Sequence, residues 1–363
     1  ACNYLGPASL SNMQYFTPQF ARPDRDSQIL FFKTKYWRIS ADGISEADIS
    51  GIPFTYWQRE LKDYDAHRLP SRMVTVTQDE DKGFNVQISE DGQKCDFLRF
   101  LVLTSWFDWE KHLDSDRRPK DPSFDTIVSP EAYRHLLSKM TAIGYLLHQY
   151  HNPAVAKAVI AMDERISAVG ESQGRSGKSL IGLALEQMQP TVTIPAKNID
   201  FANDKFIWEE VNSSTRLVIL DDIAINFDFE NLFPLITTSI TINQKGVGRF
   251  TLEGHRKPKF YITTNHAVNG NNGSTRDRQF KLAFSNYFDD SYKPEREFSC
   301  QFFSEYWDEE QWNLFYNLMA ECLLLYFEVQ KNHWGLSGSG LIEAPCDNIE
   351  QAKIGRASCR ERV

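Results

Sequence analysis

The stretch 170-GESQGRSGKS-179 is the most informative part of the chain, because it places three glycines and a Lys-Ser pair between two apolar segments. Residues 166–169 precede it and residues 180–185 follow it, which predicts a strand, a turn and a helix. Glycine-rich turns let backbone amides surround phosphate oxygens, and the N-terminus of the next helix adds partial positive charge. The stretch therefore predicts a phosphate-binding loop in an α/β sheet.

Within this loop, we expect Lys178 to reach the β- and γ-phosphates of ATP and Ser179 to coordinate Mg²⁺. The usual pattern has Gly six residues before the Lys, whereas this chain has Ser172 there, so the register of the turn stays open. A Gly-Lys-Ser tripeptide also arises by chance, and the interpretation therefore depends on downstream residues. The residues expected to bind nucleotide are Gly174, Arg175, Ser176, Gly177, Lys178 and Ser179.

A second apolar run, residues 217–220, ends in the paired acids Asp221 and Asp222. Strands of a parallel sheet deliver such residues at their carboxyl ends, where ligands bind. We expect Asp221 to hold Mg²⁺, directly or through water, and Asp222 to polarise the attacking water. The alternative is a strand end whose acids are only solvated.

A third apolar run, residues 260–264, ends in Asn265, whose amide is suited to orienting a lytic water. Arg276 and Arg278 follow. Arginine neutralises charge on a transferring phosphoryl group and is often supplied by a neighbouring subunit. We favour Arg278, with Arg276 next; the alternative for either is a surface salt bridge with Asp277.

Residues 240–252 alternate apolar and polar side chains on both sides of Lys-Gly-Val-Gly, which predicts a β-hairpin with a flexible tip. Residues 245–259 contain five Lys or Arg against the single acid Glu253. The net charge of the chain is -9, so a nucleic-acid contact requires a local basic cluster of this kind. The alternative is a solvated edge hairpin kept soluble by lysine.

The order of phosphate loop, paired acids, basic hairpin, strand ending in Asn and then Arg resembles the superfamily 3 helicases of small DNA viruses. It is most similar to the primase-helicases of phages and large DNA viruses, and it covers residues 163–290. The resemblance implies an AAA+-like P-loop fold, a homo-hexameric ring and translocation on single-stranded DNA. It also implies that Lys245 and Arg249 grip the DNA backbone, with Arg256, Lys257 and Lys259 as weaker candidates.

Composition is that of a globular protein, with 41% apolar, 25% charged and 13% aromatic residues. The longest apolar run, residues 314–327, is interrupted by polar residues and too short to span a bilayer. We therefore expect a cytoplasmic protein of a bacterial or host cell that has no membrane partner. Its six cysteines are scattered without a CxxC pair, which fits a reducing compartment and no zinc site. They are Cys2, Cys95, Cys300, Cys322, Cys346 and Cys359.

The organisation along the chain follows from these patterns. Hairpin-like pairs of strands are expected at residues 29–39 and 73–88, and a helical pattern at 130–162 and again from 307 onward. The chain starts without Met, so we expect an interior piece of a longer product with a primase or other replication domain upstream. The expected parts are a mixed α+β accessory region (1–125), a helical collar (126–162), the P-loop core (163–290), a helical C-terminal segment (291–352) and a non-native tail resembling a translated sequencing adapter (353–363).

The sequence thus favours an ATP-dependent DNA helicase motor. Two alternatives stay open. One is a small-molecule phosphotransferase, which shares the phosphate loop but does not need the basic hairpin. The other is a nucleic-acid-binding scaffold switched by nucleotide, against which the full set of Lys178, Asp221 and Asp222 argues.

Overall fold

The structure is a computed structural model that describes residues 17–80, 83–113, 124, 129–164, 175–201, 203–224, 227–246, 248–266, 273–335 and 339–345. Gly174 of the phosphate loop, residues 166–169 and the predicted tail at 353–363 lie outside these ranges. Every structural statement below concerns the described residues. Among them, no helix is both long and apolar enough to cross a bilayer.

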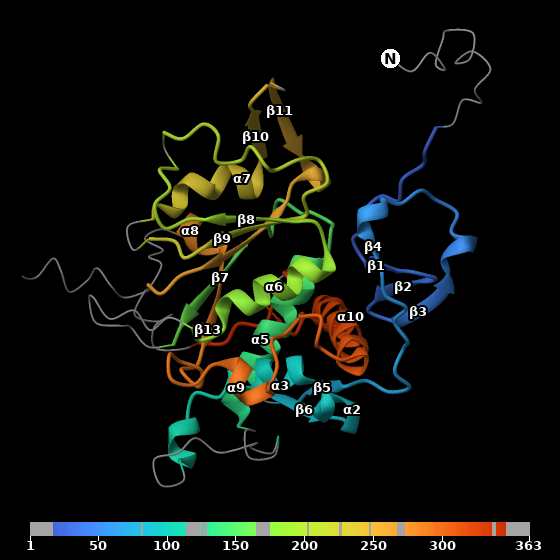
Figure 1. Cartoon of the computed structure of the whole chain (residues 1–363), viewed down its shortest axis with the longest axis vertical. Coiled ribbons are helices and arrows are strands. Elements are labelled where there is room, and N and C mark those ends of the chain that lie inside the picture. The colour runs from blue at the N-terminus through green and yellow to red at the C-terminus, as the bar shows by residue number, and fades with distance from the viewer. Residues whose placement is uncertain are drawn as a thin grey trace, which may run out of the picture.

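A five-stranded sheet forms the centre of the molecule, and all its strands run parallel (Figure 1). Its spatial order is β13-β7-β12-β9-β8, so β12 lies between the first and third strands of the sheet in chain order. This arrangement confirms the predicted α/β class with a P-loop NTPase-like parallel sheet. The strands are β7 (Ala158–Asp163), β8 (Thr191–Pro195), β9 (Leu217–Asp221), β12 (Lys259–Thr263) and β13 (Gln279–Phe284).

Both faces of this sheet are buried, each in its own hydrophobic core. In β7, Val159 and Ala161 belong to one cluster, whereas Ala158, Ile160 and Met162 belong to the other. Alternate residues of a strand point to opposite faces, so a strand covered on both sides is apolar throughout. This accounts for the unbroken apolar runs in the sequence.

The two cores are covered by different elements. Helices contribute most of the first core, and a short helix with a β-hairpin packs against the sheet strands in the second (Figure 1). The first group is α3 (Asp96–Leu103), α5 (Pro130–Leu147), α6 (Lys178–Met188) and α10 (Glu309–Asn332). The second group is η4 (Phe229–Leu232), α7 (Phe233–Thr237), β10 (Ser239–Gln244) and β11 (Gly248–Glu253).

Helices α5 and α10 cross closely at Gly144, where a Cβ atom would overlap the carbonyl oxygen of Cys322. The α5 helix begins with Ser129 as its N-cap, because the Ser129 hydroxyl accepts from the Ala132 amide and Pro130 occupies the first turn. Asp308 caps α10 in the same way, through the Gln311 amide. The expectation of a helix from residue 307 onward is confirmed by α10.

The N-terminal region packs on α10 rather than standing apart (Figure 1). Its four-stranded sheet has the order β3-β2-β1-β4, and a separate β5-β6 hairpin follows. Both predicted strand pairs in this region are confirmed. The elements are β1 (Ser27–Phe32), β2 (Lys35–Ser40), β3 (Gly43–Asp48), β4 (Leu61–Lys62), β5 (Val74–Gln78), β6 (Phe84–Ile88) and α2 (Glu90–Lys94). The remaining short elements are η1 (Ile49–Gly51), η2 (Gln58–Glu60), η3 (Trp109–His112), η5 (Gly254–Arg256), α8 (Gly273–Asp277) and α9 (Pro294–Phe298).

The prediction of helix through residue 162 is wrong beyond residue 147. The α5 helix ends at Leu147, and Ala158–Asp163 forms strand β7. The apolar residues with helical spacing all lie within α5, and Pro153 then prevents its continuation. Most of strand β7 therefore lies within the predicted helical collar, whereas the predicted strand at residues 166–169 lies outside the described residues.

Two buried lysines, Lys257 and Lys259, and the partly buried Lys62 bind carbonyl groups at the ends of helices. Lys62 donates to the carbonyl of Met188, the last residue of α6, and Lys257 donates to the carbonyl of Ile236 in α7. Lys259 donates to the Tyr145 and His148 carbonyls at the end of α5, 2.5 Å away in each case. A cation suits the negative end of a helix dipole, and these bonds satisfy otherwise unpaired acceptors.

Because of Lys259, the free energy of unfolding should vary with pH between about 7 and 10.5. Burial lowers its pKa from 10.5 to about 7, so the unfolded chain binds more protons than the folded one between these values. The free energy of unfolding should therefore rise with pH in this window, by up to about 1.4 kcal/mol per pH unit. Lys259→Met should show a shallower rise in urea unfolding measured across the window. Equal slopes for the two proteins would contradict a lowered pKa of Lys259 in the folded state.

Candidate functional site

Most of the predicted site residues meet at the carboxyl edge of the parallel sheet. Strands β7, β12 and β9 are neighbours, and each ends in polar side chains: Asp163 on β7, Thr263 on β12 and Asp221 on β9. The α6 helix begins at Lys178, at the end of the phosphate loop. The phosphate loop and the acids are far apart in sequence, and the parallel pairing brings them together.

Lys178 forms a buried ion pair with Asp163. Its Nζ lies 2.6 Å from Asp163 Oδ1 and also donates to Ser176 Oγ at 3.1 Å. Ser176 Oγ donates in turn to Asp163 Oδ1 at 2.5 Å. The side chains of Lys178 and Asp163 are only 7% and 6% exposed. Removing one partner of a buried charge pair strongly destabilises the folded protein, because the other charge stays buried without compensation.

The turn into α6 requires glycine at position 177. Gly177 has φ = +95°, and a Cβ atom there would lie 2.6 Å from the ring of Phe100 in α3. Arg175 is also left-handed, with φ = 77°, and its Nε lies 3.1 Å from the carboxylate of Asp290. The predicted loop residues Arg175 to Gly177 therefore form a tight turn that leads into α6, which begins at Lys178.

The two predicted acids are held by one threonine. Thr263 Oγ1 donates to Asp221 Oδ1 at 2.7 Å and accepts from the Asp222 amide at 2.8 Å. Ser179 Oγ donates to the same Asp221 oxygen at 3.1 Å. Asp222 has φ = 54°, a left-handed conformation that costs free energy in a non-glycine residue and is typical of functional sites.

Asn265 and Lys197 complete this cluster around Asp222. Asn265 Nδ2 donates to Asp222 Oδ1 at 3.1 Å, and Lys197 Nζ lies 3.2 Å from Asp222 Oδ2. The oxygens of Ser179, Asp221 and Asp222 are hard ligands of the type that Mg²⁺ prefers. The donor set therefore fits a magnesium ion, and Lys178 precedes Ser179 at the start of the same helix.

The two predicted arginines lie near the amino ends of the sheet strands, whereas Lys178 lies near their carboxyl ends. Arg278 directly precedes β13, and its carbonyl accepts from the amide of Ala158, the first residue of β7. The length of β7 separates these positions from Asp163, roughly 20 Å of extended chain. Arg278 is half-buried with its guanidinium 5.1 Å from the Phe233 ring centroid, whereas Arg276 is exposed. Neither arginine can reach Lys178 of its own chain.

The predicted hairpin is confirmed as β10 and β11, which stand out at one end of the molecule (Figure 1). Lys245 and Arg249 are exposed on it. Lys245 Nζ lies 5.1 Å from the centroid of the Phe206 ring, itself 41% exposed, and 3.9 Å from the Glu209 carboxylate. Asn243 and Gln244 anchor the hairpin to this neighbouring segment through their side-chain amides.

The basic run of the hairpin is shorter than the sequence suggested. Arg256 is exposed, but Lys257 and Lys259 are 4% and 6% exposed and bind helix-end carbonyls. Their inclusion among the candidates for nucleic-acid contact was therefore wrong. Their ammonium groups donate to carbonyls at the ends of α7 and α5.

Three residues of the site were not predicted: Asp163, Lys197 and Thr263. A usable signal existed for Asp163, because residues 158–163 repeat the apolar run ending in an acid that is seen in residues 217–221. Thr263 reads as an ordinary strand residue, and Lys197 lies in a loop. Their roles depend on neighbours that come from other strands.

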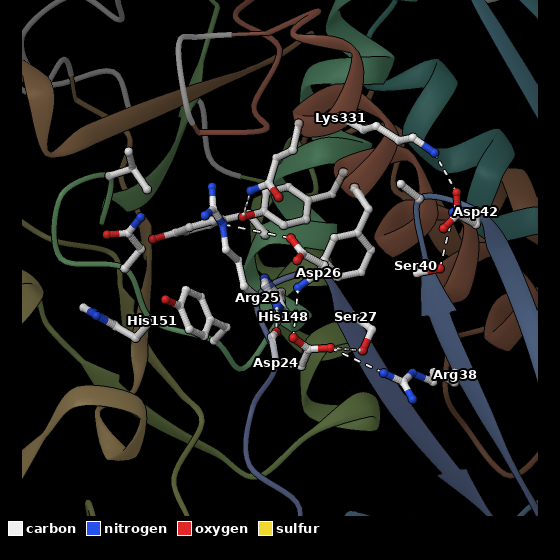
Figure 2. A pocket seen from close by; sticks show the side chains of 18 of the residues that line it. Asp24, Arg25, Asp26, Ser27, Arg38, Ser40, Asp42, His148, His151 and Lys331 are labelled. Atoms are coloured by element: carbon white, nitrogen blue, oxygen red, sulfur yellow. Dashed lines mark hydrogen bonds and ion pairs between the residues drawn. The ribbon is translucent and has the colours of Figure 1, made fainter.

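A separate polar cavity of about 820 Å³ lies between the N-terminal sheet and the ends of α5 and α10 (Figure 2). Its wall includes Lys259, the first residue of β12, so it borders the edge of the sheet opposite Asp221. Its charged groups have partners within the chain: Arg38 pairs with Asp24, and Lys331 pairs with Asp42. None of the predicted catalytic residues lines it.

The threonine that holds both acids offers a direct test of the site geometry. Thr263→Val removes the hydroxyl and leaves the Asp222 amide without its acceptor, so the free energy of unfolding should fall by about 1–3 kcal/mol. Thr75→Val, at an exposed strand position, should change it by less than about 0.5 kcal/mol. Urea unfolding of both variants makes the comparison. Equal stability of the Thr263 variant and the wild type would show that the hydroxyl does not hold Asp222.

Comparison with known proteins adds little to this picture. No protein-family model matches the chain, and no curated protein matches it. A structure described as the A-form apo C-terminal region of NrS-1 is 12% identical, with a TM-score of 0.39, over 91% of this chain and 72% of that chain. A JCV helicase bound to a thiazolopyridine compound is 14% identical, with a TM-score of 0.27, over 72% of this chain and 61% of that chain. At such low scores neither likeness carries an argument, and the α/β fold class rests on the order and direction of the strands.

Proposed function

We propose that this chain is a Mg²⁺-dependent ATPase that drives movement along single-stranded DNA. The observation that carries the proposal is the meeting of Lys178, Ser179, Asp221, Asp222 and Asn265 at the carboxyl edge of one parallel sheet. A cation, an oxygen ligand set and a water-orienting amide are what phosphoryl transfer to water requires. Because the five come from two strand ends and the start of one helix, chance assembly is a poor explanation.

In the proposed mechanism, the loop amides and Lys178 bind the phosphates of ATP. The Lys178 ammonium is already paired with Asp163, so an incoming phosphate competes with that carboxylate for it. Mg²⁺, which Ser179 and Asp221 would hold, would neutralise charge on the phosphates. Asp222 accepts a hydrogen bond from the attacking water, and Asn265, which donates to Asp222, helps to orient that water. Lys197 fixes the position of the Asp222 carboxylate.

The position of the arginines supports a ring in which subunits share active sites. Arg276 is exposed at the sheet edge opposite Lys178, so it can serve only the ATP of a neighbouring subunit. Arg278 is half-buried against Phe233, which favours Arg276 as the residue supplied between subunits. A homo-hexamer, as the family resemblance implies, would place it there.

Coupling to DNA is assigned to the β10-β11 hairpin. Lys245 and Arg249 are exposed on a projecting hairpin that follows the acids in sequence, and β11 leads through η5 into β12. Strand β12 carries Thr263, which contacts both acids. One continuous segment therefore joins the hairpin to the ATP site. This feature favours a DNA motor over a small-molecule phosphotransferase, which has no use for it.

The decisive experiment measures ATP hydrolysis with Mg²⁺ at a fixed salt concentration, with and without oligo(dT). The wild type should turn over faster with DNA, and Lys178→Ala should abolish turnover. Because that change removes the cation beside Asp163, Asp222→Asn serves as a second variant that keeps the side-chain shape, and Lys111→Ala is the exposed control. If the protein is oligomeric and its ATP hydrolysis does not change when oligo(dT) is added, the phosphotransferase is favoured. Nucleotide binding without turnover would favour the switched scaffold.

The hairpin makes a separate prediction about salt. If Lys245 and Arg249 each contact a phosphate, their replacement by Ala should weaken binding of oligo(dT) and flatten its dependence on salt. The slope of log K against log salt should fall by about 0.7 for each phosphate of a single strand that the variant no longer neutralises. Fluorescence anisotropy over a salt series measures it. An unchanged slope in the double variant would place the DNA contacts elsewhere.

A further inference from the structure

Two aromatic rings are stacked on the surface of the N-terminal region. The rings of Phe20 and Trp57 are 4.4 Å apart between centroids and 17° from parallel, yet the two residues are 37% and 43% exposed. The guanidinium of Arg59 lies 5.2 Å from the centroid of the Trp57 ring. Exposed stacked aromatics beside arginine resemble the surfaces on which proteins stack the bases of single-stranded nucleic acid.

This surface is held rigidly. The Ala21 amide donates to the Thr55 carbonyl at 3.3 Å, and the Thr55 amide donates to the Gln19 carbonyl at 2.7 Å, which pairs the two segments that carry the rings. Directly after Arg59, Glu60 forms an ion pair with Arg216 at 3.1 Å, and both side chains are nearly buried. Arg216 immediately precedes β9, so the stacked rings are tied to the ATPase sheet.

Exposed basic side chains occur both next to the rings in sequence and in η5. Arg22 is exposed two residues after Phe20, and His255 and Arg256 are exposed in η5. The pKa of His255 is lowered by burial and then by the positive charges of Arg216, Arg256 and Arg22. The adjoining acid Glu60 is already paired with Arg216. In a chain of net charge -9, a local excess of this kind favours an anionic partner.

The basic surface continues toward the hairpin. Strand β11 exposes Arg249, Thr251 and Glu253 at alternate positions and leads directly into η5 with Arg256. From Arg249 to Arg256 the chain spans roughly 20 Å, which is the length of several nucleotides. Glu253 is an acidic interruption on this route. A nucleic-acid strand held at the hairpin can therefore extend along β11 to Arg256.

We propose that Phe20, Trp57 and Arg59, with Arg22 and Arg256, form a second binding surface for single-stranded nucleic acid, on which a base stacks against the exposed part of the Phe20–Trp57 pair. The proposal deepens the motor function and rests on it for the identity of the ligand. Base stacking tolerates any sequence because every base has an aromatic face. The surface thus adds affinity outside the hairpin without adding sequence preference.

The test compares two labelled oligomers of about 16 nucleotides, oligo(dT) and an abasic strand with the same backbone, by fluorescence anisotropy on the full chain. The wild type should prefer oligo(dT). Trp57→Ala should lose about 5- to 100-fold of its affinity for oligo(dT) and little of its affinity for the abasic strand, because only stacking is removed. Trp57→Phe should retain most of the preference. Tyr306→Ala, at a residue 82% exposed elsewhere, is the control and should bind both strands like the wild type.

The outcomes separate this surface from the proposed function. If Trp57→Ala keeps the full preference for oligo(dT) while the Lys245 and Arg249 double variant loses DNA binding, the second surface is refuted and the motor function stands. If Trp57→Ala lowers the affinity for oligo(dT) and for the abasic strand equally, the residue does not stack a base and the proposal is also refuted. If the wild type binds neither strand, the second surface fails together with DNA coupling, and ATP hydrolysis alone then decides on the nucleotide site.

Discussion

The insertion of β12 between β7 and β9 is the constraint on which the site depends. Parallel pairing on both sides of β12 aligns three carboxyl ends, so that Thr263 lies next to Asp221 and Asp222 on one side and Asp163 lies on the other strand. The Lys178 that follows the phosphate loop then reaches Asp163, while Ser179 reaches Asp221. Moving any one strand by one register would turn these side chains toward the opposite face. The register of the sheet therefore also sets the geometry of the candidate site.

A second feature of the fold is that lysine side chains donate hydrogen bonds to the carbonyl groups at helix ends. The carbonyls at the end of a helix have no partners within it, and Lys62, Lys257 and Lys259 supply donors from neighbouring segments. Burial lowers the pKa of Lys62 and Lys257 to about 8 and that of Lys259 to about 7, so the arrangement carries a cost in charge desolvation. In exchange, the helix ends are fixed relative to the sheet that carries the site.

The carboxyl and amino ends of the sheet strands carry different side chains. The carboxyl edge gathers the side chains suited to ATP and Mg²⁺, whereas Arg276 and Arg278 lie at the amino edge. Strand β12 connects the two edges: its amino end follows the basic hairpin and η5, and its carboxyl end holds the acids through Thr263. A displacement of the hairpin by DNA would act on this strand, and a change at the acids would act on the hairpin. This physical connection is the reason to assign the coupling to β12.

Much of this protein follows from its sequence alone. The glycine-rich loop, the apolar runs ending in acids, the Asn after the third run and the alternation around Lys-Gly-Val-Gly are local patterns, and each has the predicted strand, helix or turn where the structure describes it. The boundary of α5 was the exception, because buried strands and buried helices are both apolar and only Pro153 separated them. The tertiary structure alone decided what depends on distant partners. It paired Lys178 with Asp163, placed Lys197 against Asp222, buried Lys257 and Lys259, and set both arginines at the far edge of the sheet. A charged side chain looks the same in a sequence whether it faces solvent or a helix end, because its environment is made by segments that only folding brings together.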